Sequence, residues 1–340
     1  MTLSIGFIGA GGIASVHLET LDNAIDGGLK NHNGDTIDVE LAAIADVNKN
    51  RAQEAATSQN ATAYTDGVEL LRSESIDAVV VTVPPFAHGD YERIAAKHDI
   101  DVFVEKPVDL SLDTARETAR RIKESNILAQ VGYVCRYGHI TERAIELLDG
   151  RQIGHIDSTY WAPIPETPWW QEQRHSGGQI VEQSTHVYDL HRYLAGEVTD
   201  VVGSGTDQLL VDEIDFQDAT SVTLDHESGV VSHISSTCTS PTFRFEVRIA
   251  AEDAYLELDY SDHSLSGTVD GEVVQFETDD NWYAREFESF IRAVAERDST
   301  WAKTSKHVDV RSDFEDAVKT LDLTLSAREA AESFEPTLRE

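Results

Sequence analysis

A short apolar stretch followed by a glycine-rich turn at the start of the chain constrains the fold more than any other feature. Residues 3–8 are mostly apolar and predict a buried strand. This strand runs into the motif Gly9-Ala10-Gly11-Gly12-Ile13-Ala14. In such a G-x-G-x-x-A turn Gly9 permits the tight bend, Gly11 lets a pyrophosphate approach the backbone, and Ala14 lets the next helix pack closely. The motif predicts a dinucleotide site, with a ligand-free glycine turn as the alternative.

An acidic residue follows the second predicted strand. This strand covers residues 39–45 and is followed by Asp46, whose carboxylate can accept hydrogen bonds from the adenosine ribose. The same charge would repel the 2′-phosphate of NADP, so Asp46 favours NAD, while Lys49 and Arg51 keep NADP possible. The interval between the glycine turn and Asp46 is longer than the usual ~20 residues. The polar segment 22–38 suggests a loop insertion that accounts for the difference. A strand-end cap is the alternative role for Asp46.

The charge balance restricts the partners of the protein. The chain of 340 residues carries 62 acidic against 27 basic residues, a net charge of −35, and only eight of the basic residues are Lys. An acidic coat spread along the whole chain suits a protein that stays soluble in very high salt, and it disfavours nucleic acid and anionic membranes as partners. No apolar run approaches the ~18 residues of a membrane span and no signal peptide is visible, so we expect a cytoplasmic protein. The two cysteines, Cys135 and Cys238, lack metal or disulfide spacing, so no metal site is expected.

The first part of the chain alternates predicted strands and helices. The β-branched run at 76–83 predicts a fully buried parallel strand, and residues 101–104 and 127–133 predict two more. Such βαβ alternation predicts a doubly wound parallel sheet. We therefore expect an α/β fold in which residues 1–133 form a dinucleotide-binding Rossmann domain.

The pattern then changes. A predicted helix at 178–194 precedes several stretches, from about residue 198, in which apolar and polar residues alternate between Gly, Asp and Ser turns. Alternation of this kind marks antiparallel strands with one buried face. We therefore expect residues 134–340 to form an α+β domain for substrate binding and oligomerisation. It would be built on an open, mainly antiparallel sheet and closed by helices at 284–297 and 309–332.

Two further motifs follow the glycine turn. One is Glu105-Lys106-Pro107, at the end of a predicted strand, and the other is Ser176-Gly177-Gly178-Gln179-Ile180-Val181-Glu182-Gln183-Ser184-Thr185-His186-Val187-Tyr188-Asp189. The three motifs, in this order, resemble the glucose–fructose oxidoreductase / inositol dehydrogenase family, Gfo/Idh/MocA, over nearly the whole chain. The resemblance implies NAD or NADP as cofactor and oxidation of a sugar, polyol or related secondary alcohol.

The resemblance also implies catalytic roles. A hydride leaves a carbinol carbon together with the hydroxyl proton, so a base must lie beside that oxygen. His186 would be this base, and Lys106 would hydrogen-bond the reacting oxygen and stabilise its developing charge. Glu182 lies four residues before His186, so one helix face could present both. Family members usually carry Asp at the position of Glu182, which leaves open whether this residue binds a substrate hydroxyl or orients His186.

The remaining site residues follow from the same resemblance and fall into two sets. The expected cofactor contacts are Gly9, Ala10, Gly11, Gly12, Ile13, Asp46, Thr82, Pro84, His88, Glu105 and Lys106. The expected substrate contacts are Lys106, Arg136, Trp169, Glu182, His186 and Asp189. Trp161, Trp169 and Trp170 could stack on a sugar ring, with core or interface packing as the alternative.

Two rival functions remain open at this point. One is a glycoside hydrolase that retains NAD and oxidises its substrate transiently, and the other is a non-catalytic sensor of a ligand or nucleotide. The presence of both Lys106 and His186 argues against the sensor, which needs neither. The exposed face of an open antiparallel sheet is unusual for a monomer, so we expect a homo-oligomer, either a dimer or a tetramer.

Overall fold

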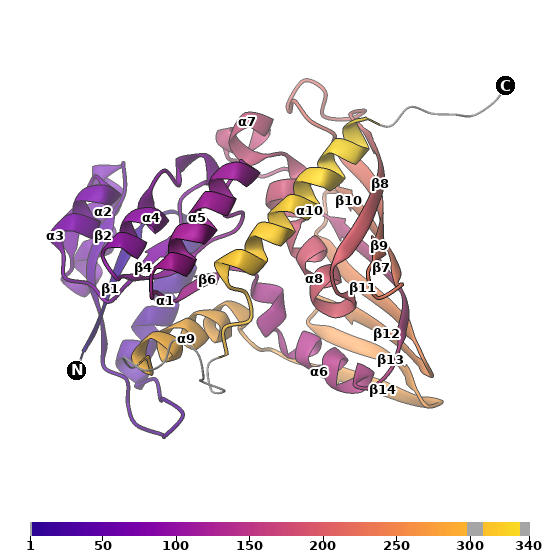
Figure 1. Ribbon diagram of the computed structural model, residues 1–340, viewed down its shortest axis with the longest axis horizontal. Helices are drawn as coiled ribbons and strands as arrows, with labels where there is room; N and C mark the ends of the chain where they lie inside the picture. The colour runs from indigo at the N-terminus through magenta and orange to yellow at the C-terminus, as the bar shows by residue number, and fades with distance from the viewer. Residues whose placement is uncertain (1, 298–308, 334–340) are drawn as a thin grey trace. The chain divides into compact units, whose positions relative to one another are not determined.

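The computed structural model describes residues 2–297 and 309–333, and the chain divides into two compact units (Figure 1). The first unit comprises Met1–Val134 and Asn281–Val318, and the second comprises Cys135–Asp280 and Lys319–Glu340. We predicted a single boundary, after residue 133, whereas the described residues 281–297 and 309–318 also belong to the first unit. None of the helices in the described part of the chain is long and apolar enough to span a bilayer.

The first unit contains a six-stranded parallel sheet, which confirms the predicted doubly wound arrangement. In spatial order its strands are β3 (Thr62–Tyr64), β2 (Val39–Ala45), β1 (Leu3–Ile8), β4 (Ala78–Val81), β5 (Asp101–Val104) and β6 (Ala129–Val131). The order reverses between β1 and β4, and ligands of such sheets bind beyond the carboxyl ends of the strands at this point. The glycine turn follows β1, and Thr82 follows β4, so both lie at this edge.

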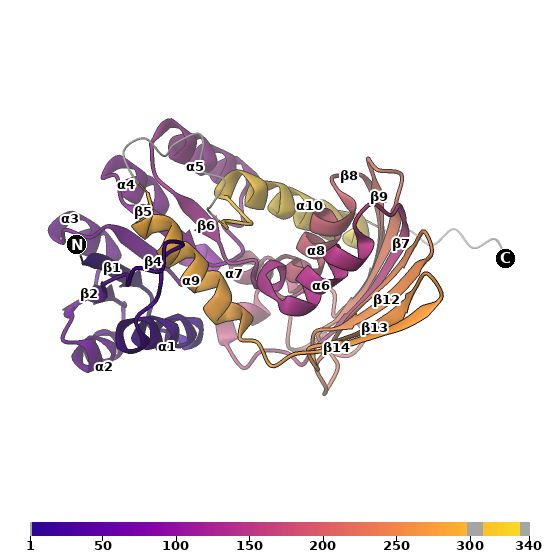
Figure 2. The ribbon, with the colours of Figure 1, turned by 90° about the horizontal axis from the view of Figure 1, so that it is seen from below.

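Helices cover both faces of this sheet. They are α1 (Gly12–Gly27), α2 (Lys49–Gln59), α3 (Gly67–Ser73), α4 (Tyr91–Lys97), α5 (Leu112–Glu124) and α9 (Trp282–Ala295), with a 3₁₀ turn η1 (Pro85–Ala87). Figure 2 shows α4 and α5 on the side of the sheet opposite α1 and α2. At the start of α5, the hydroxyl of Ser111 caps the helix by accepting a hydrogen bond from the N–H of Thr114.

Aromatic packing explains why α9 returns to the first unit. Its Phe287 ring lies 6.1 Å from the ring of Phe7 in β1 and 5.6 Å from that of Phe103 in β5. Phe290, one turn later, also lies 5.6 Å from Phe103. All four rings are fully buried in one core cluster, and burying an aromatic side chain of this size contributes about 1.5–3 kcal/mol.

The second unit is built on an eight-stranded sheet. In spatial order its strands are β14 (Glu272–Glu277), β13 (Ser264–Val269), β12 (Ala254–Asp259), β11 (Arg244–Ala251), β7 (Ile153–Trp161), β10 (Val231–Thr237), β9 (Ala219–His226) and β8 (Val198–Thr206). The pair β7–β10 is parallel and every other pair is antiparallel, so the predicted open, mainly antiparallel sheet is confirmed. The sequence analysis did not identify β13, in which Leu265 is the only fully buried side chain.

Three longer helices, α6 (His139–Leu148), α8 (Thr185–Ala195) and α10 (Phe314–Glu332), lie on one side of this sheet (Figures 1 and 2). Shorter segments are η2 (Val134–Tyr137), η3 (Pro168–Gln171), α7 (Gln173–Ser176) and the π-helical turn η4 (Gln179–Gln183). Along β9, buried and exposed residues alternate strictly, as a strand with one solvent face requires. No helix covers the other face of the sheet in the described ranges.

Candidate functional site

The glycine turn has the backbone geometry that the motif predicts. Gly9 has a φ of +103°, and a Cβ added there would lie 2.7 Å from the carbonyl oxygen of Thr82, so no other residue fits. Thr82 Oγ1 donates to the carbonyl oxygens of Gly9 at 3.1 Å and Ile8 at 3.2 Å. The structure therefore brings two predicted cofactor residues, Gly9 and Thr82, together at the switch point of the sheet.

Asp46 is bound directly to the glycine turn. Its Oδ2 accepts a hydrogen bond from the N–H of Ala10 at 2.9 Å, and its Oδ1 accepts one from the N–H of Asn48 at 2.7 Å. The nearest Arg51 nitrogen lies 4.0 Å from Oδ2. A carboxylate has about four acceptor sites, so both oxygens can still accept hydroxyl groups. This geometry orients the acid beside the turn.

The Glu105-Lys106-Pro107 motif follows β5, and its Lys106–Pro107 peptide bond is cis. The carboxylate of Glu105 is buried and is bound by His17 of α1, with 2.7 Å between Nε2 and Oε1. Sequence analysis placed Glu105 among the cofactor contacts and did not select His17. The sequence offered one signal for His17: it lies three residues after Ala14 and seven before Ala24, and therefore on the same buried face of α1.

His88 is the other buried histidine at this edge of the first unit. It is 3% exposed, and its Nδ1 lies 2.8 Å from Oε1 of Glu92, which is buried as well. This bond fixes the ring orientation of a residue that sequence analysis assigned to the cofactor. Pro84 precedes it in the same loop, at the start of the η1 turn.

Glu182 and His186 do not share a regular helix. The predicted helix at 178–194 is interrupted, because Gln179–Gln183 form a π-helical turn and α8 begins only at Thr185. Gly177 and Gly178, with φ of 82° and 85°, precede this turn. Glu182 Oε2 accepts a 2.6 Å hydrogen bond from the indole nitrogen of Trp170, so that its carboxylate is oriented by a side chain outside the helix.

The three tryptophans of this unit have different environments. Trp170 is 1% exposed and packs edge-on against Phe216, with 5.2 Å between ring centroids, in a cluster with Ile214 and Cys238. It is therefore a core residue and cannot stack on a sugar. Trp169 is half-buried, and Trp161 is exposed at the end of β7, where its indole donates to Ser235.

Arg136 and Asp189, both predicted substrate contacts, bind each other. The guanidinium donates from Nε to Oδ2 at 2.8 Å and from Nη2 to Oδ1 at 2.5 Å, and both side chains are buried. Thr320 of α10 donates to Oδ1 of the same aspartate at 3.0 Å. The Arg136 guanidinium also lies 4.8 Å above the ring of Tyr193. A bidentate, buried pair of this kind fixes both side chains geometrically.

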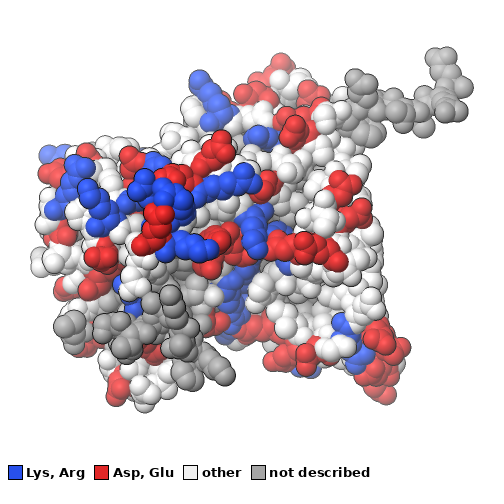
Figure 3. Space-filling model, viewed as in Figure 1, with Lys and Arg blue, Asp and Glu red and all other residues white. Residues whose placement is uncertain are grey.

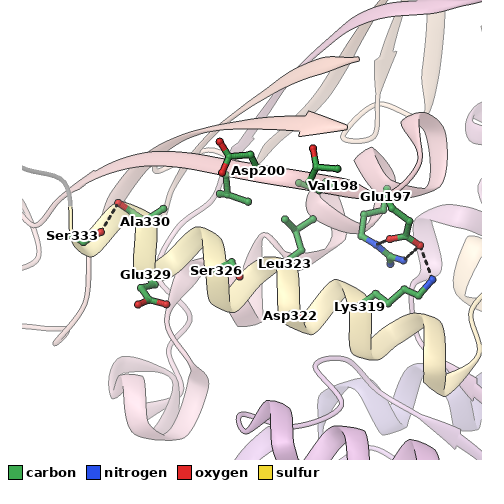
Figure 4. Close-up of a pocket in the computed structure, with 13 residues that line it drawn as sticks. Glu197, Val198, Asp200, Lys319, Asp322, Leu323, Ser326, Glu329, Ala330 and Ser333 are labelled. Atoms are coloured by element: carbon green, nitrogen blue, oxygen red, sulfur yellow. Dashed lines mark hydrogen bonds and ion pairs between the residues drawn. The ribbon is translucent and has the colours of Figure 1, made fainter. Parts of the chain in front are cut away.

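A groove of about 580 Å³ lies between β8 and α10 (Figure 4). Glu197 binds two cations in its wall, Arg192 at 3.0 Å and Lys319 at 2.8 Å, and these contacts lower the pKa of Glu197 although its partial burial opposes them. Arg192 also donates to Oγ1 of Thr320 at 2.6 Å. None of the predicted site residues lines this groove, but Thr320 connects its wall to the Arg136–Asp189 pair.

The thiol of Cys238 is buried. Burial raises the pKa of Cys238 to about 12, with a contribution from Asp218, so this thiol stays protonated at neutral pH. Cys135 is also buried. Within residues 2–297 and 309–333, no three His, Cys, Asp or Glu side chains converge in a way that could hold a metal ion.

Comparison with family models matches both units. Residues 3–133 match the model described as "Oxidoreductase family, NAD-binding Rossmann fold", and residues 142–257 match the "GFO/IDH/MocA C-terminal domain". These matches agree with the parallel sheet and the mixed sheet described above.

Similar proteins include two dehydrogenases and one solved structure. The NAD-dependent scyllo-inositol 2-dehydrogenase of Bacillus subtilis is 28% identical over 69% of this chain and 67% of its own length. The NADP-dependent D-xylose 1-dehydrogenase 2 of Haloferax volcanii is 26% identical over 75% of this chain and 81% of its own length. A levoglucosan dehydrogenase in complex with NADH superimposes with a TM-score of 0.84 at 18% identity, covering 98% of this chain and 97% of that protein.

Proposed function

The chain belongs to the Gfo/Idh/MocA family of oxidoreductases, and we propose that it is a dehydrogenase that moves a hydride between a sugar or polyol and NAD. The observation that carries this proposal is the bond between Asp46 and the glycine turn within the matched Rossmann domain. A carboxylate held there suits the ribose hydroxyls of NAD and opposes the 2′-phosphate of NADP.

The backbone and side-chain groups at the carboxyl edge of the parallel sheet are chemically suited to a nicotinamide dinucleotide. The residues that would hold it are the glycine turn Gly9–Ile13, Asp46 and the strand-end loop with Thr82, Pro84 and His88. When bound, its oxidised nicotinamide ring supplies the acceptor for the hydride. The groups of this chain then have to bind the alcohol, remove its proton and exclude water.

His186 is the proposed base and Lys106 the proposed electrophile. The hydroxyl proton passes to His186 as the hydride leaves the carbinol carbon, while the Lys106 ammonium stabilises the charge on oxygen. Glu182, held by the Trp170 indole, is proposed to bind a neighbouring hydroxyl of the substrate or to orient His186. The longer side chain of Glu, relative to the usual Asp, gives this carboxylate the reach to keep both the indole and a ligand.

The substrate class is proposed from the relatives. Their names point to inositols and aldoses, and the half-buried Trp169 together with Glu182 suits a small molecule rich in hydroxyl groups. Arg136 and Asp189 are proposed to shape the substrate site through their fixed pair. The protein is further proposed to act as a homo-oligomer in a high-salt cytoplasm, because its charge is strongly acidic and one face of its second sheet carries no helix in the described ranges.

The test is a search for NADH formation in molar KCl. Purified protein would be incubated with NAD or NADP and a panel of aldoses, inositols and sugar acids, and the NADH absorbance recorded. We expect one substrate to reduce NAD in preference to NADP, and Lys106→Ala to lower kcat by about 100-fold or more. Matching activity in the Lys106→Ala variant would contradict the assigned role. Absence of turnover with NAD retained by the purified protein would instead indicate the transient-oxidation hydrolase.

A further inference from the structure

The carboxylate of Glu105 is buried together with His17 inside the first unit. His17 is completely buried and Glu105 is 6% exposed, with 2.7 Å between Nε2 and Oε1. An ionised carboxylate only accepts hydrogen bonds, so the Nε2–H of His17 is the donor. Removing a carboxylate from water costs several kcal/mol unless a partner compensates it, and His17 provides that compensation.

The other side of the same carboxylate is held by its own motif. Oε2 accepts a hydrogen bond from the peptide N–H of Lys106 at 3.3 Å. At the end of β6, a Cβ added to Gly132 would lie 2.9 Å from Oε2, so the carboxylate packs directly against the Gly132 backbone. The carboxylate is therefore confined between His17, the Lys106 peptide and Gly132.

His17 is itself held by an aromatic enclosure. Its ring lies 5.0 Å from that of Phe103, 5.1 Å from Phe287 and 6.4 Å from Tyr283, measured between centroids. Phe103 stands two residues before Glu105 on β5, and the other two rings belong to α9. Nδ1 of His17 has no hydrogen-bond partner among the described residues. Within these residues, the ring therefore hydrogen-bonds only Glu105, through Nε2.

We infer that His17 is a positioning residue for the dehydrogenase reaction, acting through Glu105 on Lys106. The inference rests on the proposed function, in which Lys106 binds the reacting oxygen. His17 connects the helix of the glycine turn to the peptide that carries the lysine. The hydrogen bond therefore anchors the peptide that carries the proposed catalytic amine to α1, and reacting groups tolerate little misplacement.

Two substitutions separate this role from packing. His17→Phe keeps an aromatic ring in the enclosure but removes the donor to Glu105, and His17→Gln keeps an amide donor. We expect His17→Phe to lower kcat by about 10- to 100-fold with the KM for NAD unchanged, and His17→Gln to restore part of that loss. Leu29→Ala is the control, because Leu29 is buried in the core cluster that also holds Phe103 and Phe287, and its apolar side chain cannot hydrogen-bond Glu105. It should lower the melting temperature without lowering kcat.

A second measurement keeps the inference independent of turnover. The acylation rate of the Lys106 amine by limiting acetic anhydride, followed by mass spectrometry of its peptide, reports the environment of the lysine directly. If the wild type turns over no substrate, the proposed function fails, and a changed acylation rate in His17→Phe then supports only the part of the inference in which His17 positions Lys106 through Glu105. A kcat for His17→Phe equal to that of Leu29→Ala would overturn it, as would an unchanged acylation rate in the inactive case.

Discussion

At the scale of single residues, two buried histidines of the second unit, His191 of α8 and His226 of β9, lie within hydrogen-bond distance of the same hydroxyl, that of Ser232. His226 Nδ1 lies 2.8 Å from the carbonyl oxygen of Gly196, which only accepts, so Nδ1 carries the proton. Nε2 of His226 lies 2.8 Å from Oγ of Ser232. The same hydroxyl lies 2.8 Å from Nδ1 of His191, whose Nε2 lies 2.6 Å from Oγ of Ser158. His191 is fully buried, so a charge on its ring would be removed from water with no carboxylate among these partners.

The burial of His191 predicts that the free energy of unfolding of the protein decreases in mild acid. Burial, followed by the charges of His226, His233 and His155, lowers the pKa of His191 from 6.5 to about 3. Below pH 6.5 the unfolded chain therefore binds a proton that the folded chain does not, and stability falls as the pH drops from 6.5 towards 3. We expect His191 to account for about 2 kcal/mol of the free energy of unfolding lost between pH 6.5 and pH 5.

Urea unfolding in high salt at several pH values measures this loss. His191→Gln has no titrating ring, so its stability should depend less steeply on pH over the same range. Because all other titrating groups are unchanged, the difference between the two curves isolates His191. If the stability of His191→Gln depends on pH as steeply as that of the wild type, the pKa of His191 is not lowered in the folded protein.

The sequence could predict site residues where a local motif names them. The glycine turn, Asp46 and Lys106 follow strands whose ends can be located from apolar runs, and the structure places the turn and Asp46 in contact. His17 could not be selected, because its partner lies 88 residues away and only the packing of α1 against β5 brings them together. The bond from Trp170 to Glu182 also escaped prediction, since it depends on a π-helical turn.

At the scale of elements, α10 connects two polar groups of the second unit through one hydroxyl. Thr320 donates to Asp189 and accepts from Arg192, and it is completely buried. Parallel strands and amphipathic helices were predictable from their apolar periodicity. The position of α10 was not, because its apolar residues do not specify which face of which sheet they cover, and the polar contacts that settle this involve residues more than a hundred positions away.

Replacing this hydroxyl gives a test at the level of the element. Thr320→Val keeps the shape of the side chain but leaves the buried Asp189 and Arg192 each without one partner, which costs about 1–3 kcal/mol per unsatisfied group. Thr324→Val is the control, because Thr324 is equally buried on α10 but donates only to the carbonyl of Leu321 in the same helix. Thermal unfolding should show a larger decrease for Thr320→Val. Equal decreases in melting temperature for the two variants would mean that the hydrogen bonds of Thr320 to Asp189 and Arg192 do not stabilise the fold beyond helix packing.

At the scale of the whole molecule, we expect the net charge of −35 to affect both stability and association. Figure 3 shows acidic side chains over both units, with a group of Lys and Arg over α4 and α5. Much of that basic group is paired locally, as Arg120 and Arg121 with Glu117, whose pKa they lower to about 2. Salt at molar concentration shortens the Debye length to about 3 Å and screens the remaining repulsion.

Salt should therefore control both folding and assembly. In molar KCl we expect light scattering to give the mass of a dimer or tetramer, since one face of the second sheet carries no helix in the described residues. Dialysis to low salt should lower the melting temperature and the average mass, because unscreened like charges oppose compaction and association. A monomer in molar KCl would contradict the proposed homo-oligomer, and a melting temperature independent of salt would contradict the proposed adaptation to high salt.

The return of α9 to the first unit has a consequence for how the protein is made. A ribosome releases the chain from its N-terminus onwards, so β1 and β5 emerge long before the rings of Phe287 and Phe290 that cover them. Until then, the nascent sheet exposes Phe7 and Phe103, and the whole second sheet has to be synthesised in the interval. The nucleotide-binding unit is thus completed only after α9 has been synthesised, and a fragment ending at residue 133 lacks part of its own core.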